Sequence, residues 1–199
     1  MPRPNRILVE NGYYHVFNRA NNKRGVNLSH QTFDYFCYLL GDMKKIFNIS
    51  IYSYCLMTNH YHIFLQTKLK NLDKAMQYFG QRYSTYINKA LNATGPVFCT
   101  RYKSKIVTEE QYLLQLLRYI HLNPVNAKLA ENVLDYKWSS IQEYLKRCHQ
   151  LVDTSFFLNY FINLGDFIDY HHYGNTNEFQ QFYEQQKSPA LINSDTICR

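Results

Sequence analysis

Hydrophobic and polar residues alternate with a period of two in several short segments, as expected for β-strands that are partly buried in a sheet. In the first of these, Tyr14, Val16 and Asn18 share one face and Tyr13, His15 and Phe17 share the other. Two further β-rich runs are separated only by Thr58 and Asn59, which is typical of a hairpin. The expected strands are residues 13–18, 49–57, 60–67 and 101–107.

Apolar residues recur at helical spacing in two segments between these strands. Ser29 is placed to cap the first helix, and Asn71 is placed to cap a second helix over residues 72–91. The apolar stripe of the first helix is expected to be Phe33, Phe36, Cys37, Leu40, Met43 and Phe47. That of the second is expected to be Met76, Phe79, Tyr83, Ile87 and Ala90.

A third helix is expected after the last strand. Thr108 and Gln111 fit the T-x-x-Q capping box, and the helix is expected to end near Asn123 because Pro124 would stop it. Residues 136–147 suggest another helix, and the Phe-rich segments after Gln150 suggest short helices that pack on the core.

The order of these elements is β-α-β-β-α-β, which predicts an α+β protein with a ferredoxin-like antiparallel sheet and two helices on one face. The helix after Thr108 is an addition to this arrangement. We expect one domain over residues 1–150, followed by an acidic, aromatic-rich extension over residues 151–199 that is either packed on the core or flexible.

The distribution of charge points to a polyanionic partner for the first of these segments. Residues 1–150 carry 20 basic and 9 acidic side chains, whereas residues 151–199 carry 2 basic and 6 acidic ones. Such an excess favours nucleic acid, although many proteins carry surplus lysines without binding it. No membrane span or signal peptide is evident, and five widely spaced cysteines without a C-x-x-C motif indicate a reduced, cytoplasmic chain without a zinc-thiolate site.

His60 and His62 are the first candidates for chemistry. Residues i and i+2 of a strand project to the same face, so the two imidazoles could hold one divalent cation. The alternative is a strand with a merely polar exposed face.

Tyr119 and Asn123 are the second pair, because residues four apart lie one above the other on a helix. At 100° per residue they fall on a stripe with Tyr112 and Gln115, beside the apolar face. A phenol and an amide could therefore face a shared pocket, or Tyr119 could be an ordinary buried tyrosine with a bonded hydroxyl.

Arg101, Lys103 and Lys105 would lie on one face of the last strand. A row of like charges suits a phosphate backbone, and Arg19 adds to it, but lysines also protect solvated edge strands from aggregation. No glycine-rich phosphate loop, H-E-x-x-H or G-x-S-x-G motif competes with these candidates.

Taken together, these motifs resemble the single-tyrosine HUH transposases, specifically the REP-associated tyrosine transposase branch of the IS200-like group. The resemblance covers about residues 10–145, and two turns depart from it, with Thr58 where the family usually has Pro and Thr100 where it often has Gly. The matching stretches are residues 14–22, 54–62, 95–98, 101–104, 118–127 and 136–140.

The resemblance implies a function and roles for individual residues. His60 and His62, with Asn123 as third ligand, would bind Mg²⁺ or Mn²⁺, and Tyr119 would attack the scissile phosphate of single-stranded DNA to form a 5′-phosphotyrosine. The DNA would contain hairpins with a flanking guide tetranucleotide. From charge alone, Arg19, Arg101, Lys103 and Lys105 are expected at the DNA backbone.

Three questions stay open at the level of sequence. The chain could be a catalytically inactive hairpin-binding protein derived from such a transposase, or an RNA-binding module on the same fold, although sheet-face aromatics in the usual RNA-binding pattern are not evident. The active unit could be a monomer or a homodimer.

Overall fold

The computed structural model describes residues 6–21, 25–26, 29–146 and 151–173. Its centre is a four-stranded antiparallel sheet in the order β2-β3-β1-β4, so β1 and β3 are the inner strands. With one helix after β1 and one after β3, the ferredoxin-like β-α-β-β-α-β arrangement is confirmed. The strands are β1 (Tyr13–Arg19), β2 (Ile49–Leu56), β3 (His60–Thr67) and β4 (Lys103–Val107).

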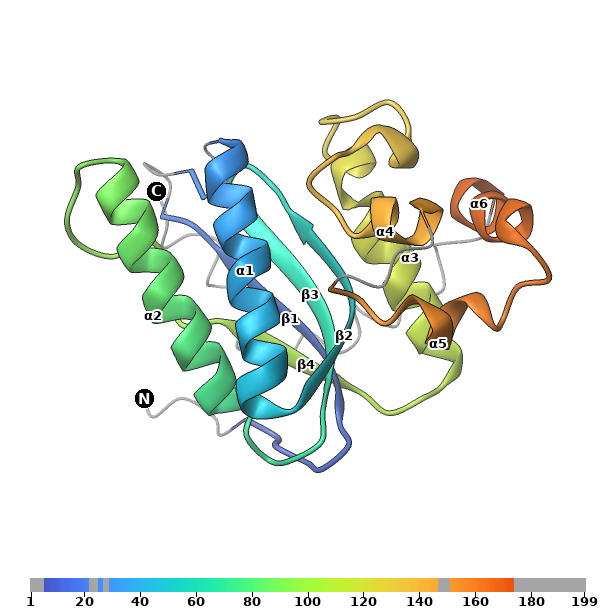
Figure 1. Ribbon diagram of the computed structural model, residues 1–199, viewed down its shortest axis with the longest axis horizontal. Coiled ribbons are helices and arrows are strands. Elements are labelled where there is room, and N and C mark those ends of the chain that lie inside the picture. Colours follow the sequence, from blue (N-terminus) through green and yellow to red (C-terminus); the bar gives the residue numbers. More distant parts are fainter. Residues whose placement is uncertain (1–5, 22–24, 27–28, 147–150, 174–199) are drawn as a thin grey trace, which may run out of the picture.

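Two long helices, α1 (His30–Phe47) and α2 (Leu72–Ala90), cover one face of the sheet (Figure 1). The Phe36 ring meets Phe79 of α2 edge-to-face at 5.3 Å and lies 5.8 Å from Tyr61 of β3, so aromatic side chains join the two layers. Ser29 caps α1 as expected, because its side chain accepts the Thr32 amide while the Thr32 hydroxyl accepts the Ser29 amide.

The expectation for α2 is wrong in two details. Asn71 does precede the helix, but its side chain makes no capping hydrogen bond and instead donates to the carbonyl of Phe47 at 2.9 Å. The amide therefore ties the start of α2 to the end of α1. Ala90 is exposed at the last turn and does not belong to the buried stripe.

The opposite face of the sheet is covered by α3 (Gln111–Asn126) (Figure 1). The capping box is not formed: the helix begins at Gln111, whose side chain donates to Glu109. The helix also continues through Pro124, contrary to expectation. Because Pro124 lies only two residues before the end, it removes one donor from the last turn, and its buried ring leaves the preceding turns intact.

The segment after α3 is less helical than expected. It forms a short 3₁₀ turn and later a short helix that begins only at Ile141. Between them, residues 138–140 lie beside β2. There the Leu56 amide donates to the Trp138 carbonyl, and the Ser140 amide donates to the Tyr54 carbonyl. These bonds occupy the Trp138 carbonyl and the Ser140 amide, one acceptor and one donor that a helix would need. The remaining elements are η1 (Val133–Asp135), α4 (Ile141–Lys146), α5 (Thr154–Leu158) and α6 (Leu164–Tyr173).

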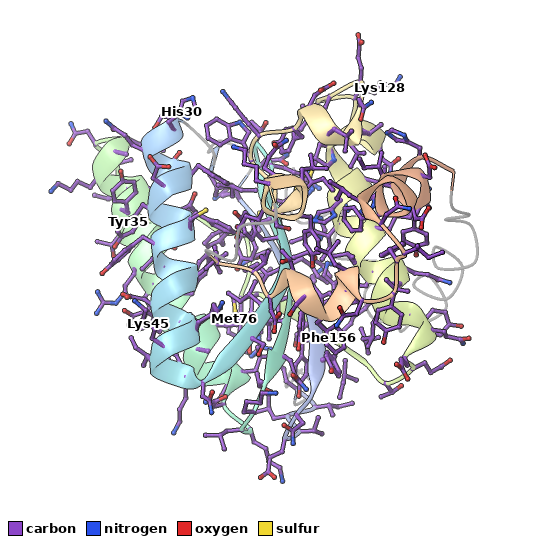
Figure 2. The ribbon with its side chains drawn as sticks, turned by 45° about the vertical axis from the view of Figure 1, so that its right-hand side comes forward. His30, Tyr35, Lys45, Met76, Lys128 and Phe156 are labelled. Atoms are coloured by element: carbon purple, nitrogen blue, oxygen red, sulfur yellow. The ribbon has the colours of Figure 1, made fainter. Side chains whose placement is uncertain are left out.

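The described part of the extension packs on the same face of the sheet as α3. Phe156 of α5 lies beside the strands (Figure 2), with its ring 4.9 Å from that of Tyr52, and Phe157 and Phe167 are buried. Residues 174–199, Cys148 and Cys198 lie outside the described residues. Among the helices that are described, none combines the length and hydrophobicity needed to cross a bilayer.

Two buried histidines attach α6 to α3. His121 Nδ1 and His171 Nε2 are 2.9 Å apart, His171 Nδ1 bonds to the Phe167 carbonyl, and His121 Nε2 bonds to the Ser140 hydroxyl. Burial is the main cause that lowers the pKa of His171 to about 4 and that of His121 well below its usual 6.5. Both rings are therefore neutral at pH 7.

We expect the protein to lose stability as the pH falls from 6.5 towards 4. In this window the unfolded chain takes up protons that the buried rings resist, so protonation favours unfolding. Replacing His171 with Gln should reduce the pH dependence of the unfolding free energy by up to about 1.4 kcal/mol per pH unit, as measured by urea titrations. Identical pH dependence in the variant and the wild type would contradict this account.

Candidate active site

The four residues expected to carry the chemistry line one cavity of about 560 Å³. The cavity lies where the ends of β1 and β3 face α3, on the side of the sheet away from α1 and α2. His60 and His62 come from β3, and Tyr119 and Asn123 come from α3. The other lining residues are Phe17, Asn18, Arg19, Asn59, Cys99, Thr100, Lys103 and Ala127.

The pairing of β1 with β3 aims both imidazoles at this cavity. His60 lies opposite Arg19 and His62 opposite Phe17, while Tyr61 between them turns to the other face and packs on Phe79. The two imidazole centroids are 5.1 Å apart with their planes at 88°. This spacing is compatible with one cation touching both rings.

Each imidazole is oriented by a hydrogen bond through its Nδ1 atom. His62 Nδ1 lies 2.8 Å from His15 Nε2, and His60 Nδ1 lies 2.7 Å from Asn59 Oδ1. The Nε2 atom of each ring is then the one available as a ligand, and the Nδ1 partner fixes the ring orientation, as is common around bound metals. The sequence motifs did not assign a role to His15.

The electrostatics of the cavity keep these rings neutral. Burial, and then the positive charge of Arg19, lower the pKa of His60 to about 4. Burial, and then the neighbouring His15 and His60, hold the pKa of His62 well below its usual value. Burial and Lys105 lower the pKa of His15 to about 3. Neutral imidazole is the form that binds a metal ion.

Tyr119 and Asn123 reach the cavity from successive turns of α3, at the edge of its buried face as expected. The Tyr119 ring stands edge-on to His62 and to His15, with centroids 5.9 and 5.8 Å apart. The Asn123 side-chain NH₂ donates to the Tyr119 carbonyl at 2.7 Å. Its Oδ1 atom is consequently the end of the amide suited to a cation.

The donor set fits a divalent cation that accepts mixed nitrogen and oxygen ligands. Two neutral imidazole nitrogens and one amide oxygen suit Mn²⁺, and Mg²⁺ tolerates such a site when water and phosphate oxygens complete it. Within the described ranges, no group of three His, Cys, Asp or Glu side chains could hold a metal ion. Asn123 lines the same cavity as the two histidines and offers an amide oxygen to it.

The four basic residues expected at DNA are not in one row. Arg19 and Lys103 line the candidate active site, and Lys105 lies opposite His15 in the β1–β4 pair. Arg101 precedes β4, which begins only at Lys103, and lines a different cavity. The expectation of three charges alternating along one strand face is therefore wrong for Arg101.

Fold and cavity together define a ferredoxin-like α+β protein that brings two histidines, a tyrosine and an amide into one basic cavity. The family model described as "Transposase IS200 like" matches residues 8–123. Because this match spans more than half of the chain, the protein belongs to the IS200-like transposase family.

Several solved structures are similar to the chain, among them the following two. One is a REP-associated tyrosine transposase bound to a REP hairpin, with a TM-score of 0.64 and 14% identity over 77% of this chain and 94% of that one. The other is a proposed transposase from Deinococcus radiodurans R1, with a TM-score of 0.41 and 16% identity over 60% of this chain and 95% of that one. No curated protein matches the sequence.

Proposed function

We propose that the protein is a metal-dependent transposase that cuts and rejoins single-stranded DNA beside hairpins through a covalent 5′-phosphotyrosine. The observation that carries this proposal is the meeting of His60, His62, Tyr119 and Asn123 in one cavity. Membership in the IS200-like family supports strand transfer on DNA, and the similar protein bound to a REP hairpin supports the choice of a hairpin.

In this proposal, His60 and His62 through Nε2 and Asn123 through Oδ1 hold Mg²⁺ or Mn²⁺. When bound, such a cation polarises the scissile phosphate and offsets the charge that builds up during the displacement. His15 and Asn59 hold the two imidazoles in orientation, and the neutral state of the rings avoids competition from protons at pH 7.

Tyr119 supplies the nucleophile. Its hydroxyl oxygen attacks phosphorus, a new P–O bond forms to the tyrosine, and the bond from phosphorus to the 3′ oxygen breaks. The phenol gives up its proton and the departing 3′ oxygen takes one up, so charge is balanced. In rejoining, a 3′-hydroxyl attacks the phosphotyrosine and the phenol leaves. No nucleotide hydrolysis is required, because the covalent bond conserves the phosphodiester.

The cavity also carries positive charge for the DNA backbone. Arg19 and Lys103 line it directly, and Lys105 lies one pleat further along β4. We assign phosphate contacts to these three side chains and to Arg101 outside the cavity. Since such contacts release counterions, binding should weaken as salt is raised.

Replacing Tyr119 with Phe should abolish the covalent protein–DNA adduct, because the attacking oxygen is gone, while hairpin affinity stays within about twofold. The measurement is a denaturing gel of labelled hairpin DNA incubated with Mn²⁺, alongside fluorescence anisotropy for binding. Tyr112→Phe, on the same stripe of α3 but outside the cavity, is the matched control and should form the adduct. An adduct on the Tyr119→Phe protein would exclude Tyr119 as nucleophile. Binding without any adduct in the wild type would identify a non-catalytic hairpin-binding protein.

Replacing His60 with Ala should remove one metal ligand and lower DNA cleavage by at least about a hundredfold at limiting Mn²⁺. Initial cleavage rates over a Mn²⁺ titration, with a chelator as the zero point, provide the measurement. His172→Ala, an exposed histidine on α6 that bonds to Asn132, serves as the control and should leave the titration unchanged. Full activity of the wild type in the chelator would rule out the metal role.

His15 should act through His62, as a positioning residue. His15→Ala removes the partner of His62 Nδ1, so we expect Mn²⁺ affinity to fall by about tenfold or more, as read from the free-Mn²⁺ signal in electron paramagnetic resonance without DNA. In His15→Gln a side-chain oxygen can accept the same hydrogen bond, and most of the affinity should return. Equal losses in both variants, with folding verified by circular dichroism, would show that the histidine is needed only for packing.

A further inference from the structure

The outer face of the two long helices carries four tyrosines that the proposed function does not use. Tyr35 and Tyr38 lie three residues apart on α1, and Tyr78 and Tyr86 lie two turns apart on α2, so each pair shares one face of its helix. Figure 2 shows Tyr35 on the side of α1 that faces away from the sheet, and Tyr38 exposes 59% of its surface. Single exposed tyrosines are ordinary, whereas a group of them is typical of an interaction surface. These four residues form the tyrosine row.

The tyrosine row is held in place across the two helices. The Tyr35 and Tyr86 rings stack with their centroids 4.1 Å apart and their planes at 17°, and Tyr35 also stacks on Tyr38 at 5.8 Å. The Tyr78 hydroxyl donates to Asp42 Oδ2 at 2.9 Å, and a hydrogen bond to the same carboxylate is the main cause that raises the pKa of Tyr38. Because these rings are already ordered, a partner that contacts them loses little affinity to their immobilisation.

Positive charge lies beside these rings. The Arg82 guanidinium lies 4.5 Å from the centroid of the Tyr78 ring, and both Arg82 and Lys89 are exposed. The nearby carboxylate of Asp42 is already bonded by tyrosine hydroxyls. Arginine next to tyrosine is the combination enriched at the centres of protein interfaces. The two cations share a hollow of about 310 Å³, which is lined by Tyr35, Gln81, Arg82, Thr85, Tyr86 and Lys89.

The arrangement favours a protein partner over DNA. Single-stranded DNA binds by stacking its bases on aromatic rings while rows of cations follow its phosphates. Here the Tyr35 and Tyr86 rings stack on each other, so no gap between them can receive a base. The carboxylate of Asp42 lies within the tyrosine row and repels phosphate. A short protein segment meets neither obstacle, because its charges can be placed singly.

A second copy of this chain fits the surface less well than a different protein does. In a two-fold contact the same surface patch meets itself, so Arg82 and Lys89 of one copy would approach the same two cations of the other. Like charges that face each other across an interface weaken it. A partner that carries carboxylates has the complementary charge.

We infer that the outer face of α1 and α2, around Tyr38 and Arg82, binds an acidic segment of a different protein that also carries an apolar or aromatic side chain. Its carboxylates pair with Arg82 and Lys89, and its apolar side chain enters the hollow beside Tyr35. None of these residues lines the candidate active site, which lies on the side of the sheet away from α1 and α2. The partner and a DNA strand can therefore be bound at the same time, and the inference does not depend on the proposed function.

Peptide selection on the full chain is the direct test. A random peptide library displayed on phage is panned against the protein, and the recovered peptides are synthesised with a fluorescent label for anisotropy. We expect peptides rich in Asp and Glu beside an apolar residue, whose affinity falls at least about tenfold in Arg82→Glu and in Tyr38→Ala. Both side chains are exposed, so the variants should fold, as verified by circular dichroism. Lys128→Glu and Tyr160→Ala change an exposed cation and an exposed tyrosine elsewhere on the surface, and should leave the affinity unchanged.

The other possible occupants are outcomes of the same experiment. Panning that enriches no acidic peptides, or peptides that bind Arg82→Glu as tightly as the parent, would overturn the inference. A DNA hairpin or oligothymidylate that loses as much affinity in Arg82→Glu as the peptides do would assign the surface to DNA instead. A parent that is dimeric in sedimentation velocity, with monomeric Arg82→Glu and Tyr38→Ala, would assign it to a second copy. Adduct formation, which these variants should retain, is scored separately and decides the proposed function alone.

Discussion

The antiparallel pairing of β1 with β3 is the constraint on which the candidate site depends. Its register sets Phe17 against His62 and Arg19 against His60, and it brings His15 within 2.8 Å of His62. Because side chains alternate between faces, a slip of one residue in β3 would turn both imidazoles towards α1 and α2. That slip would also bring Tyr61 out of its aromatic contacts with Phe36 and Phe79, so core packing and site geometry enforce the same register.

Local signals along the chain were sufficient for most of the fold. Alternation located the strands and periodicity located the helices, since both reflect burial of one face. Helix ends were harder to predict where a side chain had a choice of partners. Ser29 has its capping partner three residues away, whereas the Asn71 amide bonds to Phe47 from a different helix. Nothing near Asn71 in the sequence indicates that competing acceptor.

In the candidate site, too, contacts within one element are predictable from the sequence, and contacts between elements are not. His60 with His62, and Tyr119 with Asn123, are pairs within a single element, so spacing alone placed each pair on one face. The contact of His15 with His62 joins residues 47 positions apart and follows from strand order and register, which alternation does not specify. The prediction for Arg101 is wrong because the strand begins two residues later than its pattern suggests, so Arg101 lies before the strand and lines a different cavity, beside α2.

The end of β1 couples the two faces of the sheet. Asn18 lines both the candidate active site and the cavity between α2 and the segment 98–102, and the next residue, Arg19, lines the candidate active site. The Asn18 amide and the Arg19 carbonyl also hold the segment 98–102 in place. These hydrogen bonds fix Cys99 and Thr100, which line the candidate active site together with Arg19. The wall of the site next to Tyr119 is therefore positioned by hydrogen bonds to the end of β1, which adapt less than long side chains do.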